Sequence, residues 1–275
     1  MEKRTALVII DPQNSFMDLP DAPLPVPGAT GDMERLAALV RLRRSTVIDK
    51  IFVSLDTHVV DHISHAKRWV DKDGNHPAPF TVITHKECLQ GTWQAANPVD
   101  QKWQLEYLRR LTRPHVIWPV HGQKPSWEWD IYEPLLFELS AGREVAFLEK
   151  GMHRDTEQFG LFGADVPYPG ASETNINLAL IDEINSFDRI VFAGEASSHC
   201  VMDSVNQFLL NIKKRDAEKV VLLKDCMSPV PGFESVASNW LTEMEQCGVA
   251  VIDSRDIRRS APYHSQITHR QCTET

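Results

Sequence analysis

Six short apolar runs constrain the fold of this chain more than any other feature of its sequence. Each run is nearly continuous in Val, Ile, Leu, Phe and Ala rather than alternating with polar residues. Continuous runs of this length are typical of strands that are covered on both faces. The sequence therefore predicts six such strands, at Ala6–Ile10, Ile51–Leu55, Val145–Leu148, Ile190–Ala193, Val220–Leu223 and Val249–Ile252.

Segments with helical periodicity lie between these runs. In Val201–Arg215 the apolar residues form a stripe on one helical face, and the basic residues at its end would complement the helix dipole. Strands that alternate with helices favour a parallel sheet with helices on both sides. We predict a three-layer α/β/α fold around a six-stranded, mostly parallel sheet. The other expected helices are Met33–Leu42, Ile131–Leu139, Asn175–Ile184 and Ser235–Met244.

One long interval does not follow this alternation. Residues from about Ser64 to Pro114 mix aromatic, proline and charged residues, with one helix-like piece at Gln101–Leu111. Long irregular insertions are usually functional or mobile. We expect a single domain over residues 1–275, with an insertion or lid at about 64–117. A polar tail from about residue 260 lacks periodicity.

Composition excludes several classes of protein. A formal net charge of -9 disfavours a nucleic-acid binder, which needs clustered Lys and Arg. No apolar stretch approaches the roughly 20 residues of a membrane span, and the N-terminal apolar run is too short for a signal peptide. The five cysteines are scattered and odd in number, which suits reduced thiols. We therefore expect a cytoplasmic protein without membrane or nucleic-acid partners.

Chemically active residues follow four of the predicted strands directly. Asp11 follows the first, Asp56-Thr57-His58 the second, Lys150 the third, and the turn Gly194-Glu195-Ala196-Ser197-Ser198-His199 leads to Cys200 after the fourth. Ligands of open parallel sheets bind beyond the carboxyl ends of the strands. Singly, these residues could be a buried thiol, a cap or a solvated lysine. Together they predict a site at one edge of the sheet.

Cys200 stands where a strand passes into a helix. The helix dipole is expected to lower the pKa of its thiol, and backbone N–H groups there can form an oxyanion hole. Asp11 could take the thiol proton as a general base, and Lys150 could stabilise developing negative charge.

Several motifs together resemble the isochorismatase-like cysteine hydrolases. They are Asp11/Gln13/Phe16 after the first strand, Lys150-Gly151, and Gly194/Ala196/Cys200-Val201 before a helix. The resemblance implies a catalytic triad of Asp11, Lys150 and Cys200. It also implies an oxyanion hole formed by the N–H groups of Ala196 and Cys200.

The same resemblance implies further features of the site. Gln13, Phe16 and Phe159 would contact the substrate, and a cis peptide would join Glu195 and Ala196. Glu195 departs from the family pattern, which usually has an aliphatic residue there.

Two further motifs are similar to those of nicotinamidases. Asp56-Thr57-His58 and Trp118-Pro119-Val120-His121 imply that Asp56, His58 and His121 bind a divalent metal. His62 would be a further ligand or would support the site. One carboxylate and two imidazoles suit zinc, with iron or manganese as alternatives. The alternative is that both histidines are polar loop residues.

The resemblance implies an amidohydrolase that cleaves a small carboxamide, nicotinamide or a related amide, to carboxylate and ammonia through a thioester. One alternative is a metal-independent carbamoyl or ureido hydrolase, and another is a catalytically silent binding or scaffold protein. Family members are commonly oligomers, so a homo-oligomer is expected.

Overall fold

The computed structural model of the chain describes residues 4–42, 48–141 and 144–257. The predicted polar tail and Cys272 lie outside the described residues. Cys88, Cys200 and Cys226 are free thiols, as expected. Cys247 is not a free thiol, which differs from that expectation.

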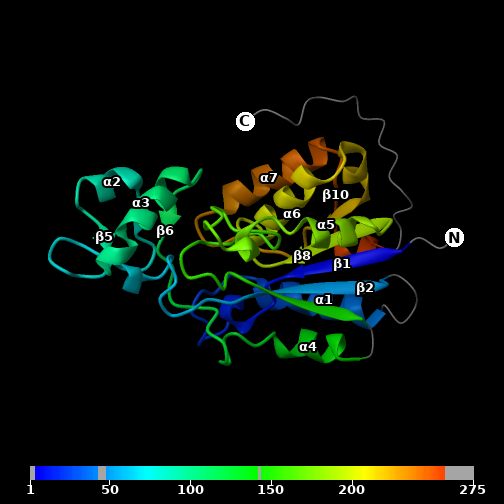
Figure 1. Cartoon of the computed structure of the whole chain (residues 1–275). Helices are drawn as coiled ribbons and strands as arrows, with labels where there is room; N and C mark the ends of the chain where they lie inside the picture. The colour runs from blue at the N-terminus through cyan, green and yellow to red at the C-terminus, as the bar shows by residue number, and fades with distance from the viewer. Residues whose placement is uncertain (1–3, 43–47, 142–143, 258–275) are drawn as a thin grey trace.

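A six-stranded sheet forms the centre of the molecule (Figure 1). Its order is β10-β9-β8-β1-β2-β7, and every neighbouring pair is parallel. All six predicted runs are strands of this sheet, which confirms the α/β prediction. The strands are β1 (Thr5–Ile10), β2 (Lys50–Asp56), β7 (Val145–Lys150), β8 (Arg189–Gly194), β9 (Val220–Leu223) and β10 (Ala250–Ile252).

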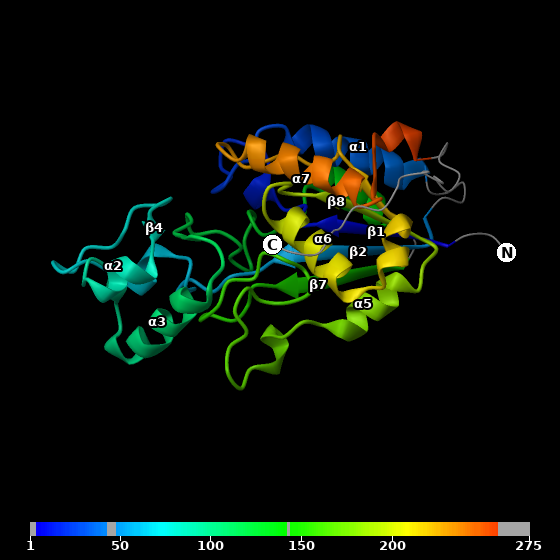
Figure 2. The same ribbon diagram turned by 90° about the horizontal axis from the view of Figure 1, so that it is seen from above.

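Helices cover both faces of the sheet (Figure 2). Successive side chains of a strand point to opposite faces. Leu7 and Ile9 of β1 accordingly pack with α1 and α4, whereas Ala6 and Val8 pack with α5, α6 and α7. The helices are α1 (Ala29–Leu42), α4 (Glu133–Leu139), α5 (Leu178–Asn185), α6 (Cys200–Asn211) and α7 (Glu234–Gln246).

Two details differ from the sequence predictions. Helix α6 ends at Asn211 because Ile212 has an extended backbone, so the basic residues of 213–215 lie beyond the helix. Strand β7 is an edge strand, and its Phe147 is 50% exposed. The apolar run of β7 is therefore not covered on both faces.

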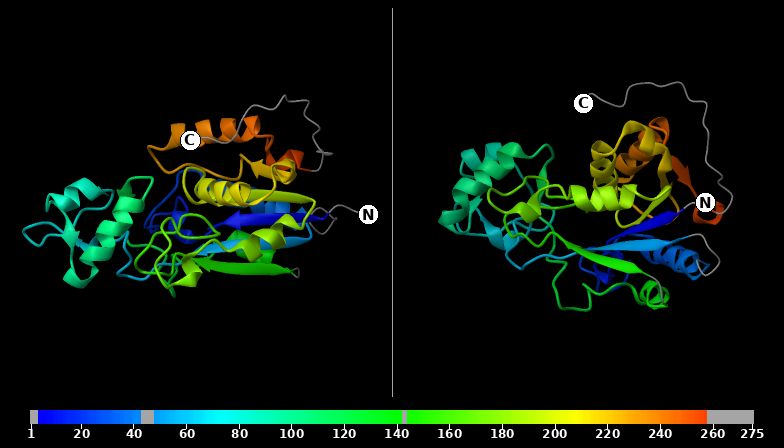
Figure 3. Two further views of the ribbon diagram at one scale, coloured as in Figure 1. Left: turned by 45° about the horizontal axis from the view of Figure 1, so that its top comes forward. Right: turned by 45° about the vertical axis from the view of Figure 1, so that its right-hand side comes forward.

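Part of the long interval between β2 and β7, residues 64–117, folds into a compact unit at one end of the sheet (Figure 3). We call these residues the insertion. Its apolar core includes Trp69, Ile83, Tyr107 and Ile117. Its elements are β3 (Trp69–Val70) paired with β5 (Gln94–Ala95), β4 (Val82–Ile83) paired with β6 (His115–Val116), and helices α2 (His85–Leu89) and α3 (Gln101–Arg110).

The carboxyl ends of β1 and β8 approach each other closely. Gly194, with φ +116°, ends β8, and a Cβ on it would lie 2.1 Å from the carbonyl oxygen of Ile10. Only glycine fits this approach. It brings the turn before Cys200 beside Asp11. No helix in the described part of the chain is both long and apolar enough to cross a membrane.

Candidate active site

Lys150, at the end of β7, is the central cation of a buried charge network. Its Nζ lies 3.0 Å from Asp11 Oδ2 and 2.8 Å from Asp56 Oδ1, and it donates to Cys200 Sγ at 3.6 Å. Burial alone would lower the pKa of Lys150, but the charges of Asp11 and Asp56 raise it well above its usual range. The ends of four strands thus bring these side chains together.

Asp11 is held from its neighbouring strand. The hydroxyl of Ser54, on β2, donates to Asp11 Oδ1 at 2.6 Å and accepts from the Asp11 N–H at 3.0 Å. Asp11 also has φ +44°, a left-handed conformation that is uncommon outside glycine. Burial raises the pKa of its carboxyl, against the lowering effect of the Lys150 ammonium. A fully buried carboxyl with a raised pKa suits a general base.

Cys200 is the first residue of α6, as predicted, but its thiol is not acidified. Burial raises the pKa of Cys200 well above its usual value, and Lys150 opposes this less strongly. Asp11 and Asp56 add to the increase because two carboxylates face the sulfur. The expected lowering by the helix dipole is therefore wrong for this environment. Cys200 rests as a thiol that needs a base.

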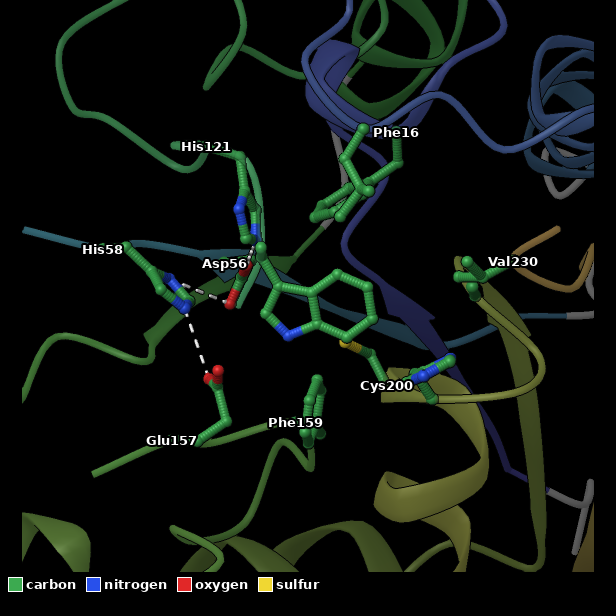
Figure 4. A pocket seen from close by; sticks show the side chains of 12 residues that line it. Phe16, Asp56, His58, His121, Glu157, Phe159, Cys200 and Val230 are labelled. Atoms are coloured by element: carbon green, nitrogen blue, oxygen red, sulfur yellow. Dashed lines mark hydrogen bonds and ion pairs between the residues drawn. The ribbon is translucent and has the colours of Figure 1, made fainter. Parts of the chain in front are cut away.

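An open cavity lies above Cys200. One wall is apolar and aromatic, and the other carries the polar groups of Asp56, His58, His121 and Glu157, as Figure 4 shows. Such a pocket suits a small planar ligand with a few polar atoms. The remaining lining residues are Phe16, Leu24, Trp118, Phe159, Ala196, His199 and Val230.

The predicted metal ligands meet at the polar wall. One nitrogen or oxygen atom from each of Asp56, His58 and His121 lies within 4.8 Å of the others. His121 Nε2 is 3.2 Å from Asp56 Oδ2, and the buried His58 Nδ1 has no hydrogen-bond partner. A Cβ on Gly151 would lie 3.0 Å from that nitrogen. One carboxylate and two imidazoles, the burial of all three side chains and the His58 nitrogen without a hydrogen bond fit a divalent metal.

His62 supports this wall without a free nitrogen. Its Nδ1 contacts Ser64 Oγ at 2.6 Å, and its Nε2 contacts the carbonyl oxygen of Thr156 at 3.0 Å. Its ring lies 4.2 Å from that of His58, centroid to centroid. These contacts fit a supporting role. His62 also forms, with His58 and Glu157, a second group whose atoms lie close enough to hold a metal, so both roles predicted for His62 stay open.

Similarity to known proteins was found only among solved structures. No family model matches the chain, and a search of curated proteins also finds no match. A nicotinamidase/pyrazinamidase of Acinetobacter baumanii is 20% identical, with a TM-score of 0.65 over 94% of this chain and 99% of that chain. A pyrazinamidase of Pyrococcus horikoshii in complex with zinc is 18% identical, with a TM-score of 0.57 over 91% and 99%.

An isochorismatase-like hydrolase from Alkaliphilus metalliredigens is 17% identical, with a TM-score of 0.54 over 93% of this chain and 98% of that chain. The chain has the isochorismatase-like hydrolase fold. This confirms the fold implied by the sequence motifs. At these identities the likeness concerns the fold, and function must be argued from the site.

Within the isochorismatase-like fold, the other predicted site residues divide into two groups. Phe16, Phe159 and Ala196 line the cavity, and the peptide between Glu195 and Ala196 is cis, as expected. Gln13 does not belong to the described lining. Its amide instead donates to the carbonyl of Asp56 at 3.0 Å and accepts from the Asp56 N–H at 2.7 Å. Gln13 therefore joins β1 to β2, and its expected contact with substrate is corrected.

Two residues of the site were missed by the sequence reasoning. Ser54 orients Asp11, and its signal was its place as the polar residue within an apolar strand. Glu157 faces His58 Nε2 at 3.3 Å, and His58 and Lys150 both contact Asp56 Oδ1. Burial alone would raise the pKa of Glu157, but His62 and His58 hold it well below its usual range. The polar wall therefore carries two carboxylates.

Proposed function

We propose that the protein is a cysteine-dependent amidohydrolase that cleaves a small planar carboxamide, nicotinamide or a related amide. The observation that carries this proposal is the position of Lys150 Nζ, within 3.6 Å of Cys200 Sγ and 3.0 Å of Asp11 Oδ2. A thiol, a carboxyl base and an ammonium at one buried point match the needs of nucleophilic acyl transfer. The similar nicotinamidase and pyrazinamidase folds support the same chemistry.

The reaction divides into acylation and deacylation. Asp11 takes the thiol proton while Cys200 Sγ bonds to the amide carbon, and Lys150 stabilises the charges of the pair. The carbon–nitrogen bond then breaks, and the leaving nitrogen takes the proton from Asp11 and departs as ammonia. A water gives a proton to Asp11 and its oxygen to the thioester carbon. The carbon–sulfur bond breaks, the sulfur regains a proton, and the carboxylic acid leaves.

The N–H groups of Ala196 and Cys200 are the proposed oxyanion hole, because both residues line the cavity at the nucleophile. Phe16 and Phe159 would contact the flat faces of the substrate. Asp56, His58 and His121 would hold a divalent metal, with zinc as the first candidate. When bound, the metal would supply a Lewis-acidic position for a ring nitrogen or a water.

The test is ammonia release from nicotinamide and from a panel of small amides. Cys200→Ala should abolish release, by at least about a thousandfold, while circular dichroism shows an unchanged fold. Cys88→Ala, at a free thiol of the insertion, is the matched control and should keep activity. Turnover by Cys200→Ala would exclude Cys200 as nucleophile.

The same panel separates the alternatives. Release from ureido or carbamoyl compounds alone, by protein that retains no metal in elemental analysis, would support the metal-independent hydrolase. No release from any amide would support the silent binding protein.

A further inference from the structure

Phe80 of the insertion has an unusual conformation that burial does not explain. Its φ is +67°, in the left-handed region, which is a genuine outlier for a bulky side chain. Its ring is 57% exposed and is not part of the apolar core of the insertion. Strained residues persist where the surroundings enforce them, and they cluster at functional sites.

The surroundings of Phe80 connect it to the cavity. Its N–H donates to the carbonyl of Ile117 at 2.5 Å, and the Ile117 N–H donates to the carbonyl of Thr81 at 2.9 Å. These bonds extend the β4–β6 pair to the residue directly before Trp118. The Trp118 N–H is held in turn by the carbonyl of Ser64 at 2.8 Å. The backbone on both sides of Phe80 is therefore fixed against the segment that carries Trp118.

The side chain of Phe80 meets Trp118 edge to face. The two ring centroids are 6.0 Å apart, with an interplanar angle of 89°. Trp118 lines the cavity. There the centroid of its ring lies 6.2 Å from that of Phe159 and 5.4 Å from that of His199. Phe80 does not belong to the described lining of the cavity, so it contacts Trp118 from outside.

We propose that Phe80 is a positioning residue that fixes the indole of Trp118 and thereby sets the position of the aromatic wall that the substrate would contact. The inference rests on the proposed function, because it assumes a planar substrate beside Trp118. Edge-to-face aromatic pairs stabilise one relative orientation of the rings. The insertion thus contributes to substrate selection through one ring, although Phe80 itself does not touch the substrate.

The conformation of Phe80 allows its ring to be tested apart from its backbone. Phe80→Gly removes the ring and relieves the left-handed backbone, so the variant should be at least as stable as wild type to urea. Phe80→Tyr keeps the ring and should behave as wild type. Phe137→Ala is the matched control, since Phe137 is 74% exposed on α4.

The first measurement does not depend on turnover. Protein labelled with 5-fluorotryptophan is studied by fluorine NMR, and Trp118→Phe assigns the Trp118 signal among the seven tryptophans. In Phe80→Gly the Trp118 signal should shift or broaden, whereas Phe80→Tyr and Phe137→Ala should leave it in place. An unchanged Trp118 signal in Phe80→Gly would overturn the proposal.

The second measurement is steady-state kinetics with nicotinamide and with an aliphatic amide. In Phe80→Gly the KM for nicotinamide should rise by about two- to tenfold, with kcat changed less than about twofold. The KM for the aliphatic amide should stay constant. Equal losses for both amides would contradict a role in ring recognition. If wild type hydrolyses neither amide, the proposed function fails, and fluorine NMR alone decides the role of Phe80.

Discussion

Glu195 places a carboxyl in a fully buried position in the turn before Cys200. Its Oε2 accepts from the N–H of Ser228 at 3.2 Å, and its side chain is next to Asp32 on α1. Burial raises the pKa of Glu195 well above its usual value, and the charge of Asp32 adds to this. Where an aliphatic residue would be neutral at any pH, Glu195 must hold a proton to be neutral.

This makes stability depend on pH in a definite direction. The folded-state pKa of Glu195 is raised above its unfolded value of about 4.5. The protein therefore keeps the full stability associated with a protonated Glu195 below about pH 4.5, and it loses this stability as pH rises toward the folded-state pKa. Glu195→Gln removes the titration. Its unfolding free energy in urea should exceed that of wild type increasingly between about pH 5 and pH 8, by up to about 1.4 kcal/mol per pH unit.

Glu243→Gln, at an exposed position on α7, is the control and should follow the wild-type profile. Parallel profiles for Glu195→Gln and wild type would show that Glu195 does not titrate differently in the folded protein.

Residues that follow a strand directly could be located from the sequence, because the end of a parallel strand fixes where the next side chain lies. Asp11, Lys150 and Cys200 were found in this way, and the structure brings them together. Gln13 was misjudged because its amide pairs with the backbone of the neighbouring strand, which only the sheet order reveals. Glu157 was missed because its approach to His58 depends on the path of a loop.

At the scale of elements, Arg113 links the insertion to α6, the helix that begins at Cys200. Its Nη1 lies 2.5 Å from Asp203 Oδ2 on α6, and its Nε lies 3.3 Å from Asp165 Oδ2. Its guanidinium carbon lies 5.0 Å from the ring centre of Phe159, on the cavity wall. Burial raises the pKa of Asp165 to about 7, against the lowering effect of Arg113.

Arg113→Ala should destabilise the protein by about 1–3 kcal/mol at pH 8, because it leaves two buried carboxylates without their cation. In wild type the raised pKa of Asp165 makes the unfolding free energy fall as pH rises, and this fall ends once pH exceeds the folded-state pKa of about 7. In the variant the pKa of Asp165 is higher because Arg113 no longer lowers it. The difference in unfolding free energy between the variant and wild type should therefore grow between about pH 6 and pH 8. Urea unfolding across this range measures it.

The control is Arg109→Ala on α3. Arg109 is 60% exposed and pairs with Glu106 one turn away, so its loss should leave the unfolding free energy nearly unchanged at both pH 6 and pH 8. Equal effects of the two substitutions would mean that Arg113 acts as an ordinary surface cation.

Elements were easier to predict from sequence than their surroundings. The six strands follow from continuous apolar runs, and α3 from the periodicity within Gln101–Leu111. The exposure of Phe147 was not predictable, because an apolar run looks the same at the edge of a sheet as at its centre. The end of α6 at Asn211 was also missed, since a helical stripe does not mark where the backbone becomes extended.

At the scale of the whole molecule, the proposed metal ligands come from two regions that are far apart in the sequence, one before and one after the insertion. Asp56 ends β2 of the central sheet, whereas His121 follows β6 of the insertion by a few residues. The apolar core of the insertion is distinct from the two cores that cover the sheet. A metal held by Asp56, His58 and His121 would therefore join the segments through which the chain enters and leaves the insertion.

Metal binding should accordingly stabilise the protein as a whole. A ligand that binds only the folded state, at a concentration a hundredfold above its Kd, stabilises by about 2.7 kcal/mol. For a chain of this size that corresponds to an increase in Tm of about 5–10 °C when zinc is added to chelator-treated protein. Hydrogen exchange should slow around His121 as well as at the end of β2, because both regions supply ligands. His121→Ala should lose the increase in Tm, whereas His85→Ala, on α2 of the insertion, should keep it. Equal responses of these two variants would place the zinc elsewhere on the protein, since only His121 belongs to the donor set that joins the two regions.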